Sequence, residues 1–531
     1  MAELDIEADV NALLCPPPGR EYLTIERQPS HYNPLHRFDL AKGDQKHYQQ
    51  QYGDMYFLRL AKLKPVVEDI AAEEWDGFQI AGEQVRRVDR VLDVRQGELC
   101  YVAGTVYMDM PLKPNILDDI SKDHWIAIPP PREKYLSPTG QDQIMLEDES
   151  GRLRLIGTPL QTNMLVTGCI IAVMGTENAN GDFEIVDLKV PDLPRQPQRW
   201  ERDDSAAVLA KGNTKKDEER IGGGKVAIRW ERDDSAAVLA KGNTKKDEER
   251  IGGGKVAIVS GLGISGDEAD SLSLDLLMEF LLGEAGGSAE QQEASRISRL
   301  IIAGNSLAES APLPSRDDLS GKRTGKKYGY DSSSYNPAPT IHLDTFLSTL
   351  LPSIPVTLLP GDSDPANVSL PQQPIHPALF PQSRAYAATA GSEEPGWFDS
   401  VTNPWEGDVD GWRLMGTGGQ PVDDVYKYVD GDERLDMMES MLRWRCGAPT
   451  APDTLWCYPF QEKDQFVIEE CPHVYFVGNQ PKFETTVIEG PAGQNVRLIA
   501  VPRFNERGEV VLLDMDSLDV ETVKFDVYEN T

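Results

Sequence analysis

Residues 256–266 read Val-Ala-Ile-Val-Ser-Gly-Leu-Gly-Ile-Ser-Gly, and this stretch decides how the second half of the chain folds. Its four leading apolar residues predict a buried strand, and the glycines after them predict a tight turn. A helix is expected next, marked by Leu272, Leu276, Phe280 and Leu281. Further strands are expected at 300–303 and 356–359, with an apolar helix near 343–351 between them. Folds with this alternation place their functional groups in the loops that follow the strands.

Three later loops carry a similar mixture of glycine and polar residues. They read Ala-Gly-Asn-Ser-Leu at 303–307, Leu-Pro-Gly-Asp-Ser-Asp-Pro-Ala-Asn at 359–367 and Val-Gly-Asn-Gln-Pro at 477–481. In order and spacing these blocks resemble those of calcineurin-like metallophosphoesterases, which read Asp-x-His, Gly-Asp, Gly-Asn-His and Gly-His-x-His. The resemblance implies an α/β sandwich over residues 255–531, which ends in strands at 496–501 and 510–513.

Most metal-ligand positions of this resemblance hold residues that bind metals poorly. A two-metal hydrolase needs anionic oxygens and imidazoles to hold its cations roughly 3.5–4 Å apart. The degenerate positions implied by the resemblance are Gly261, Gly263, Asn305, Asp362, Ser363, Asn479 and Pro481. Asp362 and Asp364 could each touch a cation, but two carboxylates on one loop do not make a binuclear site. We therefore expect no catalytic residue, no bound metal and no cofactor.

The histidines of this region offer no replacement for the missing ligands. His342, His376 and His473 lie outside the expected ligand positions. We interpret each as a capping, core or surface side chain.

A narrower resemblance, to the small (B) subunits of DNA polymerase delta, rests on several segments that occur in the right order. They are Tyr48-Gln-Gln-Gln-Tyr52 with Tyr56 and Arg59-Leu60-Ala61, His376-Pro-Ala-Leu-Phe-Pro381, Val401-Thr-Asn-Pro-Trp405, Gly416-Thr-Gly-Gly-Gln-Pro421 and Cys471 to Phe483. It covers about residues 30–190 and 255–531. It implies a non-catalytic accessory subunit for DNA replication and repair in the nucleus. Such a subunit grips the C-terminal domain of the catalytic polymerase subunit, contacts a third, regulatory subunit and meets DNA only indirectly through the complex.

Net charge argues against a general DNA-binding protein. The 531 residues include 53 Lys and Arg against 87 Asp and Glu, a formal charge of −34. So acidic a chain repels a phosphate backbone unless it has a local basic patch. The small patches Lys322-Arg323 and Lys326-Lys327 are interpreted first as a solvated loop and second as a weak nuclear-import signal.

Cysteine usage and hydropathy exclude several other classes. Six cysteines occur without a Cys-x-x-Cys pair, which argues against a zinc module and against a disulfide framework and fits a reducing compartment. The start of the chain has no basic and apolar secretion signal, and no apolar run approaches 18 residues, so no membrane span is expected.

The N-terminal part predicts a helix followed by a barrel. An amphipathic helix is expected over 46–64, closed by Pro65, with its apolar stripe serving intramolecular packing rather than a partner groove. Five strands follow, at 99–110, 143–146, 153–156, 166–174 and 183–190, and they suit an OB-fold barrel. Its hairpins carry Asp142, Glu147, Asp148, Glu149, Asp182, Glu184 and Asp187. Because single-strand-binding OB folds use basic and aromatic grooves, a protein-contact role is favoured.

Residues 199–228 and 229–258 are identical copies. Most of the unit is charged and glycine-containing, and only its end, Lys-Val-Ala-Ile, is expected to form a strand. We expect only the second copy of this tetrapeptide, 255–258, in the sheet, with 225–228 in a loop.

The expected fold class is α+β. N-terminal helices and an OB-fold barrel precede a calcineurin-like α/β sandwich that lacks its metal ligands. The expected divisions are an N-terminal arm and helices at 1–91, the OB fold at 92–192, a linker at 193–254 and the sandwich at 255–531, with a mobile insertion at 308–337.

Three functions fit parts of this pattern. An accessory polymerase subunit is favoured; the alternatives are a single-strand DNA-binding OB protein and a residual phosphoesterase. Candidate partner anchors, which could equally be core aromatics, are Trp397, Phe398, Trp405 and Trp412.

Overall fold

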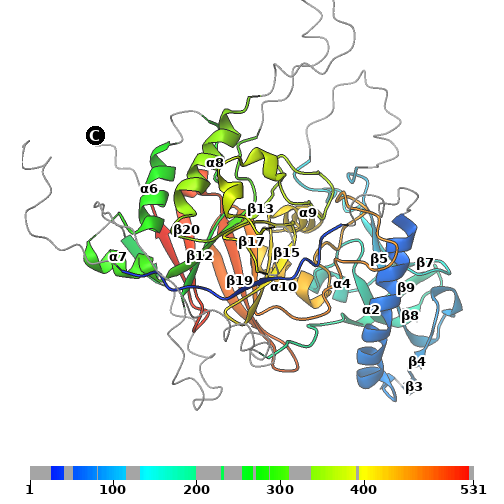
Figure 1. The fold of residues 1–531 in the computed structure, drawn as a ribbon. Coiled ribbons are helices and arrows are strands. Elements are labelled where there is room, and N and C mark those ends of the chain that lie inside the picture. Colours follow the sequence, from blue (N-terminus) through cyan, green and yellow to red (C-terminus); the bar gives the residue numbers. More distant parts are fainter. Residues whose placement is uncertain are drawn as a thin grey trace, which may run out of the picture.

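A computed structural model describes residues 25–40, 52–80, 82–114, 132–198, 229–232, 254–266, 271–285, 287–309, 336–389 and 394–525. Several expectations lie outside this part of the chain: the first copy of the duplication, most of the 308–337 insertion with its basic patches, and residues 46–51 of the predicted helix. In Figure 1 a helix and a barrel occupy one side of the molecule, and two large sheets occupy the other.

The first half of the described chain forms a helix and a closed β-barrel. Its elements are α2 (Tyr52–Trp75), β2 (Gln79–Ile80), β3 (Glu83–Gln84), β4 (Arg86–Arg87), β5 (Leu99–Asp109), β6 (Gln143–Glu147), β7 (Arg152–Ile156), α4 (Pro159–Thr162), β8 (Ile170–Glu177) and β9 (Asp182–Lys189). The sheet order is β4-β5-β6-β7-β9-β8, and β5 also pairs with β8. That pairing closes five strands into a barrel, as the sequence predicted.

Gly104 allows two barrel strands to approach closely. A Cβ atom added there would lie 2.6 Å from the carbonyl oxygen of Glu147 on β6. The glycine inside this predicted strand is therefore required by packing. One strand start was wrong: β8 begins at Ile170 rather than at residue 166.

Helix α2 runs past Pro65, so the prediction that this proline closes the helix was wrong. A proline inside a helix removes one backbone hydrogen bond and costs several kcal/mol. The cost is offset because Val67, Ala71 and Trp75 continue the buried face by one and then two further turns. They pack with Leu60 and other residues against the β5 and β8 side of the barrel, so the stripe is an intramolecular face.

The second half forms two facing sheets. The first has the order β10-β21-β20-β11-β12-β13-β14 and the second β1-β15-β16-β17-β19-β18. The first comprises β10 (Arg229–Arg232), β11 (Lys255–Val259), β12 (Ile297–Ala303), β13 (Val356–Leu359), β14 (Phe398–Ser400), β20 (Glu509–Asp514) and β21 (Val520–Lys524). The second comprises β1 (Tyr32–Pro34), β15 (Trp405–Val409), β16 (Trp412–Thr417), β17 (Val474–Gln480), β18 (Glu484–Glu489) and β19 (Asn495–Pro502). A shared core containing Ile258, Ile301, Phe476 and Ile499 joins the two sheets.

Helices cover the outer faces of this sandwich (Figure 1). They are α6 (Ser271–Leu282), α7 (Ser288–Ser295), α8 (Ala338–Leu350), α9 (Gln420–Tyr428), α10 (Arg434–Arg443) and the short α11 (Phe504–Arg507). Helices α6 and α8 pack on the first sheet. Helices α9 and α10 share a core with the second sheet and with the barrel. Leu272 of α6, expected on the apolar face, is 51 % exposed, because the buried face is formed by Leu274, Leu277 and Leu281.

The second copy of the duplication contributes two strands. Its end, residues 255–258, forms all but the last residue of the buried strand β11 between β12 and β20, as expected. Its start, Arg229–Arg232, pairs antiparallel with β21 as the edge strand β10. The prediction that only the tetrapeptide forms a strand was therefore wrong. A polar segment pairs with the free edge of β21, and its sequence pattern does not mark it as a strand.

Residues 25–40, the N-terminal strap, cross the sandwich from α7 toward the barrel side and appear as the dark blue trace in Figure 1. Arg27 donates hydrogen bonds to the carbonyl oxygens of Leu281, Ala294 and Ile297 at 2.6, 2.9 and 2.6 Å. At the middle of the strap, β1 pairs with β15. None of the helices in the described part of the chain is long and apolar enough to cross a membrane.

Candidate functional site

Five loops from both sheets meet at one edge of the sandwich. Strands β11, β12, β13 and β14 run parallel, so the loops after them gather at the same edge. The Gly261 amide donates to the Gly304 carbonyl at 2.9 Å, and the Gly263 amide donates to the Asn305 carbonyl at 3.2 Å. We call the segments 260–266, 304–307, 360–364, 418–419 and 478–481 the loop cluster; the last of them is the end of β17 with Pro481.

Asn479 connects the two sheets within the loop cluster. Its backbone amide donates to Ser260 Oγ at 2.8 Å, and its side-chain Nδ2 donates to the Gly418 carbonyl at 2.7 Å. The side chain is 3 % exposed. At this predicted site position the amide therefore serves to hold neighbouring loops.

The glycine positions have no room for the side chains that a metal site needs. A Cβ on Gly261 would lie 2.8 Å from Asn479 Oδ1, and one on Gly263 would lie 2.6 Å from Asn505 Nδ2. Both glycines have a φ of +61°, which side-chain-bearing residues rarely adopt. An aspartate or histidine at either position would therefore strain the backbone and require the side chain of Asn479 or Asn505 to move.

Asp364 is buried and binds backbone amides. Its carboxylate accepts hydrogen bonds from the amides of Ser306, Leu307 and Gly361 at 3.2, 2.9 and 2.8 Å. Burial raises the pKa of Asp364, and these amide hydrogen bonds oppose that shift. Asp362, two residues earlier, is exposed. The two carboxylates considered as cation ligands thus have different surroundings.

The other predicted positions also have structural contacts or face solvent. Asn305 Oδ1 accepts a hydrogen bond from the Ser363 amide at 3.3 Å, and Ser363 Oγ donates to the Leu307 carbonyl at 2.6 Å. Pro481 is exposed. Across the residues that the structure describes, no group of three or more His, Cys, Asp or Glu side chains could hold a metal ion.

The histidines lie away from the loop cluster's ligand positions. His376 Nδ1 accepts from the Ala378 amide at 3.1 Å and caps a short 3₁₀ helix, Pro377–Leu379. His473 is 5 % exposed, and its Nδ1 accepts from the Arg413 amide at 3.1 Å. His376 is therefore a capping side chain and His473 a core side chain, two of the roles expected for the histidines.

A cluster of side-chain amides beside the loop cluster was missed by sequence reasoning. Asn403 Oδ1 accepts from the Gly418 amide at 2.9 Å and from Thr417 Oγ1 at 3.0 Å. Asn403 Nδ2 donates to Gln372 and Gln420 at 2.8 and 2.9 Å. The signal was available in part, because Asn403 and Gln420 lie in two of the segments that carry the polymerase-subunit resemblance.

The four candidate anchor aromatics differ in their exposure to solvent. Phe398 and Trp405 are 3 % and 2 % exposed, so they are core side chains. Trp412 is partly buried and donates from Nε1 to the Met515 carbonyl at 2.7 Å. Trp397 is 48 % exposed and alone remains a candidate anchor.

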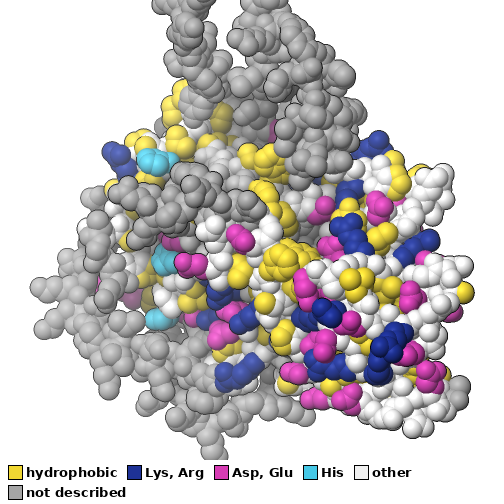
Figure 2. All heavy atoms as spheres, turned by 90° about the vertical axis from the view of Figure 1, so that its right-hand side faces the viewer, with side chains coloured by type: hydrophobic (Ala, Val, Ile, Leu, Met, Phe, Trp, Pro, Cys, Tyr) yellow, Lys and Arg dark blue, Asp and Glu magenta, His cyan; other side chains and the backbone are white. Residues whose placement is uncertain are grey.

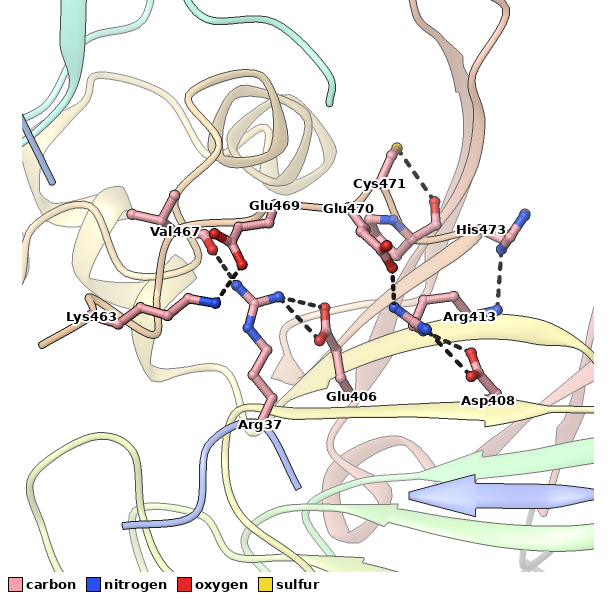
Figure 3. A network of polar contacts seen from close by, with 11 residues as sticks. Arg37, Glu406, Asp408, Arg413, Lys463, Val467, Glu469, Glu470, Cys471 and His473 are labelled. Atoms are coloured by element: carbon pink, nitrogen blue, oxygen red, sulfur yellow. Dashed lines mark hydrogen bonds and ion pairs between the residues drawn. The ribbon is translucent and has the colours of Figure 1, made fainter. Parts of the chain in front are cut away.

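A polar network joins the strap to the segment before β17 (Figure 3). Arg37 contacts both carboxylate oxygens of Glu406 at 3.1 Å and also the Val467 carbonyl. Arg413 bonds Asp408 at 2.7 Å and Glu470 at 2.9 Å. Burial would lower the pKa of Arg413, but the Asp408 hydrogen bond and the surrounding carboxylates outweigh it and raise that pKa.

The barrel side carries both signs of charge. Asp148, in the β6–β7 turn, accepts from the amides of Val91, Ser150 and Gly151. Glu147 pairs with Arg152 at 2.7 Å. Figure 2, which views this side, shows acidic and basic side chains mixed together with no continuous basic stripe. A groove that tracks a phosphate backbone is basic throughout.

Comparison with protein families gives two matches. Residues 51–188 match the DNA polymerase delta subunit OB-fold domain. Residues 256–485 match the family of the B subunits of DNA polymerases alpha and epsilon.

Curated relatives extend over nearly the whole chain. The DNA polymerase delta small subunit of Arabidopsis thaliana is 34 % identical over 508 residues, which is 95 % of this chain and 98 % of the relative. The protein of the same name from Saccharomyces cerevisiae is 33 % identical over 523 residues, 93 % of each chain. DNA polymerase delta subunit 2 of Drosophila melanogaster is 32 % identical over 486 residues, 90 % of this chain and 94 % of the relative.

Proposed function

Because this chain belongs to the family of DNA polymerase delta small subunits, we propose that it acts as a scaffold between two other proteins of that polymerase complex. Membership makes it an accessory, non-catalytic subunit of a complex that replicates DNA. The finer proposal is that it holds the C-terminal domain of the catalytic subunit and a third, regulatory subunit together in the nucleus. DNA contact is then indirect, through the complex.

One observation carries the non-catalytic part of this proposal. In the loop cluster the polar side chains serve as internal braces: Asp364, Asn305 and Asn479 all bond neighbouring loops. A water-activating two-metal centre needs ligands that point at the cations instead. We therefore propose that the second half is an inactive calcineurin-like phosphoesterase domain, with Gly261, Gly263, Asn305, Asp362, Ser363, Asn479 and Pro481 at the former ligand positions.

The layered sandwich supports this fold proposal. Loops freed from catalysis can form a binding surface, because turns on a rigid frame present groups in fixed positions. We propose the divisions 1–91, 92–192, 193–254 and 255–531, with an insertion at 308–337. The barrel and the sandwich share a core with α9 and α10, which suits a subunit that has to present both to partners as one body.

The proposal is tested by partner capture. The isolated chain at moderate salt should capture the catalytic subunit's C-terminal domain and bind single-stranded DNA weakly or not at all. Tight, salt-sensitive binding to single-stranded DNA without capture would favour the OB-protein alternative. Removal of the four basic residues at 322–327 should spare assembly, even if nuclear entry slows.

The phosphoesterase alternative has its own test. With manganese present, the purified chain should leave a generic phosphodiester intact. Turnover that disappears when Asp362 or Asp364 is substituted would contradict the proposal.

A further inference from the structure

A shallow, largely open cleft of about 400 Å³ lies between the start of α2 and the β6–β7 hairpin. Tyr56 and Phe57 of the helix form one wall, and residues 147–152 form the other. Phe57 is 53 % exposed. The buried face of α2 uses Met55, Leu60 and later residues, so the Phe57 ring is left for solvent or for another molecule.

An exposed leucine lies beside the hairpin wall. Leu92 is 68 % exposed, and a Cβ on Gly151 would lie 3.0 Å from its Cδ2 atom. Its amide also donates to Ser150 Oγ at 3.2 Å, which fixes it beside the hairpin.

The hairpin wall is acidic. Three consecutive carboxylates, Glu147 to Glu149, line the cleft, and Arg152 supplies the single guanidinium there. Glu147 is paired with Arg152, and Asp148 is bonded to the turn. Glu149 is exposed and has no hydrogen-bond or ion-pair partner within the part of the chain that the structure describes.

The negative charge extends to the helix wall of the cleft. Burial first, and then the charges of the three carboxylates, raise the pKa of Tyr56 to about 12, partly opposed by the Thr105 hydroxyl. A field of this sign repels phosphate groups and attracts cations. Single-stranded DNA is therefore a poor occupant, although the wall is aromatic.

An aromatic wall opposite carboxylates fits a Lys or Arg side chain. The aliphatic stem packs on the ring while the charged head reaches the acidic rim, and a cation near a ring face gains further attraction. The chain shows the same chemistry nearby, where the Arg152 guanidinium lies 4.3 Å from the Tyr107 ring centroid. The exposed Phe57 ring would take an apolar neighbour of that basic residue.

We propose that this cleft docks a Lys- or Arg-bearing segment with an apolar anchor from another subunit of the polymerase complex. The inference rests on the proposed function only for the statement that the chain is built into a complex. The chemistry of the occupant comes from the cleft.

Site-directed photo-cross-linking in the assembled complex tests it. Phe57 of the full chain is replaced by benzoylphenylalanine, the complex is purified with its catalytic and regulatory subunits, and cross-linked peptides are identified by mass spectrometry. We expect one partner segment with a Lys or Arg close to an apolar residue. Adding Glu149→Lys should lower its yield several-fold, because reversing one exposed charge replaces an attraction to the basic residue by a repulsion.

Matched controls use exposed residues outside the cleft. Phe78 is 49 % exposed and lies beyond the far end of α2. Trp75, the last residue of α2, is roughly 27 Å from Phe57 at 1.5 Å per helical residue, and Phe78 follows it by three residues. The same probe at Phe78 should not reach that segment. Glu184→Lys on β9 reverses an exposed charge outside the cleft and should leave the Phe57 yield unchanged.

The outcomes separate this inference from the proposed function. If the complex assembles but the Phe57 probe labels only DNA, only a second copy of this chain, or nothing, the docking inference is overturned and the scaffold function stands. A yield that does not respond to Glu149→Lys also overturns it, because the contact would not depend on charge. If the chain does not co-purify with the catalytic subunit, both proposals fail.

Discussion

Asp364→Ala should destabilise the loop cluster strongly, whereas Asp362→Ala on the same loop should not. The Asp364 carboxylate accepts three backbone hydrogen bonds, from Ser306, Leu307 and Gly361. Each buried donor left without a partner costs about 1–3 kcal/mol. The burial penalty of the carboxylate, visible in its raised pKa, offsets part of this cost. With three donors left unpartnered and part of the cost offset, we expect a net loss of about 3–5 kcal/mol.

Amide hydrogen exchange measures this loss locally. The exchange of the amides of residues 306, 307 and 361 should be at least about a hundredfold faster in Asp364→Ala, since 1.4 kcal/mol corresponds to a factor of ten. Because Asp362 is exposed, its truncation should change stability by less than about 0.5 kcal/mol.

The opposite pattern would refute this reasoning. If both carboxylates were cation ligands, manganese would protect the wild-type loops from exchange, and either substitution would remove that protection. Equal effects of the two substitutions, or protection by manganese that depends on both, would show that Asp364 is not a structural brace.

Three substitutions and one deletion elsewhere in the chain have defined expected outcomes. Arg27→Ala should lower the free energy of unfolding by about 2–3 kcal/mol, measured by urea denaturation, because its partly buried guanidinium bonds three carbonyls. Partial burial lowers the pKa of Arg27 to about 10. Gly104→Ala should cost about 1–3 kcal/mol and lower the melting temperature, since its Cβ would lie 2.6 Å from a β6 carbonyl oxygen; an unchanged melting temperature would contradict the close approach. Burial would raise the pKa of Glu469, but two lysines outweigh burial and lower that pKa from 4.5 to about 2. The free energy of unfolding of the wild type should therefore exceed that of Glu469→Gln above pH 4.5. This difference should disappear as the pH falls toward 2. Deleting residues 199–228 should leave thermal stability nearly unchanged, because the length of a connection alters loop-closure entropy only slightly. A fall in the free energy of unfolding of several kcal/mol would show that the first copy is structural.

The barrel was predictable because each of its strands is visible locally. Alternation and turn residues marked strands close to the observed β5, β6, β7 and β9. The closing pair of β5 and β8 was inferred only from the fold class, since no local signal encodes it. The error at Pro65 arose because a local breaker was outweighed by packing of Trp75 and its neighbours on the barrel.

The gathering of the loop cluster was also predictable, because parallel strands bring their ends to one edge. The role of Asp364 was not. A sequence shows a carboxylate but not whether it faces a cation or three backbone amides. Asn403 was likewise unassigned, since its partners Gln372 and Gln420 come from separate loops.

The N-terminal strap left no sequence signal at all. Residues 25–40 are polar and contain prolines, without helical or strand periodicity. Their long-range hydrogen bonds are made with residues more than 250 positions away, such as Arg27 with Leu281. Pairing over such separations depends on the completed fold, so local pattern cannot reveal it.

The scaffold claim is tested most directly by one titration. A labelled C-terminal domain of the catalytic polymerase subunit is titrated with the full chain, with excess single-stranded DNA present, and its fluorescence anisotropy is followed. The account predicts saturable one-to-one binding that the DNA does not displace. Absence of saturation, or loss of binding as DNA is added, would contradict it.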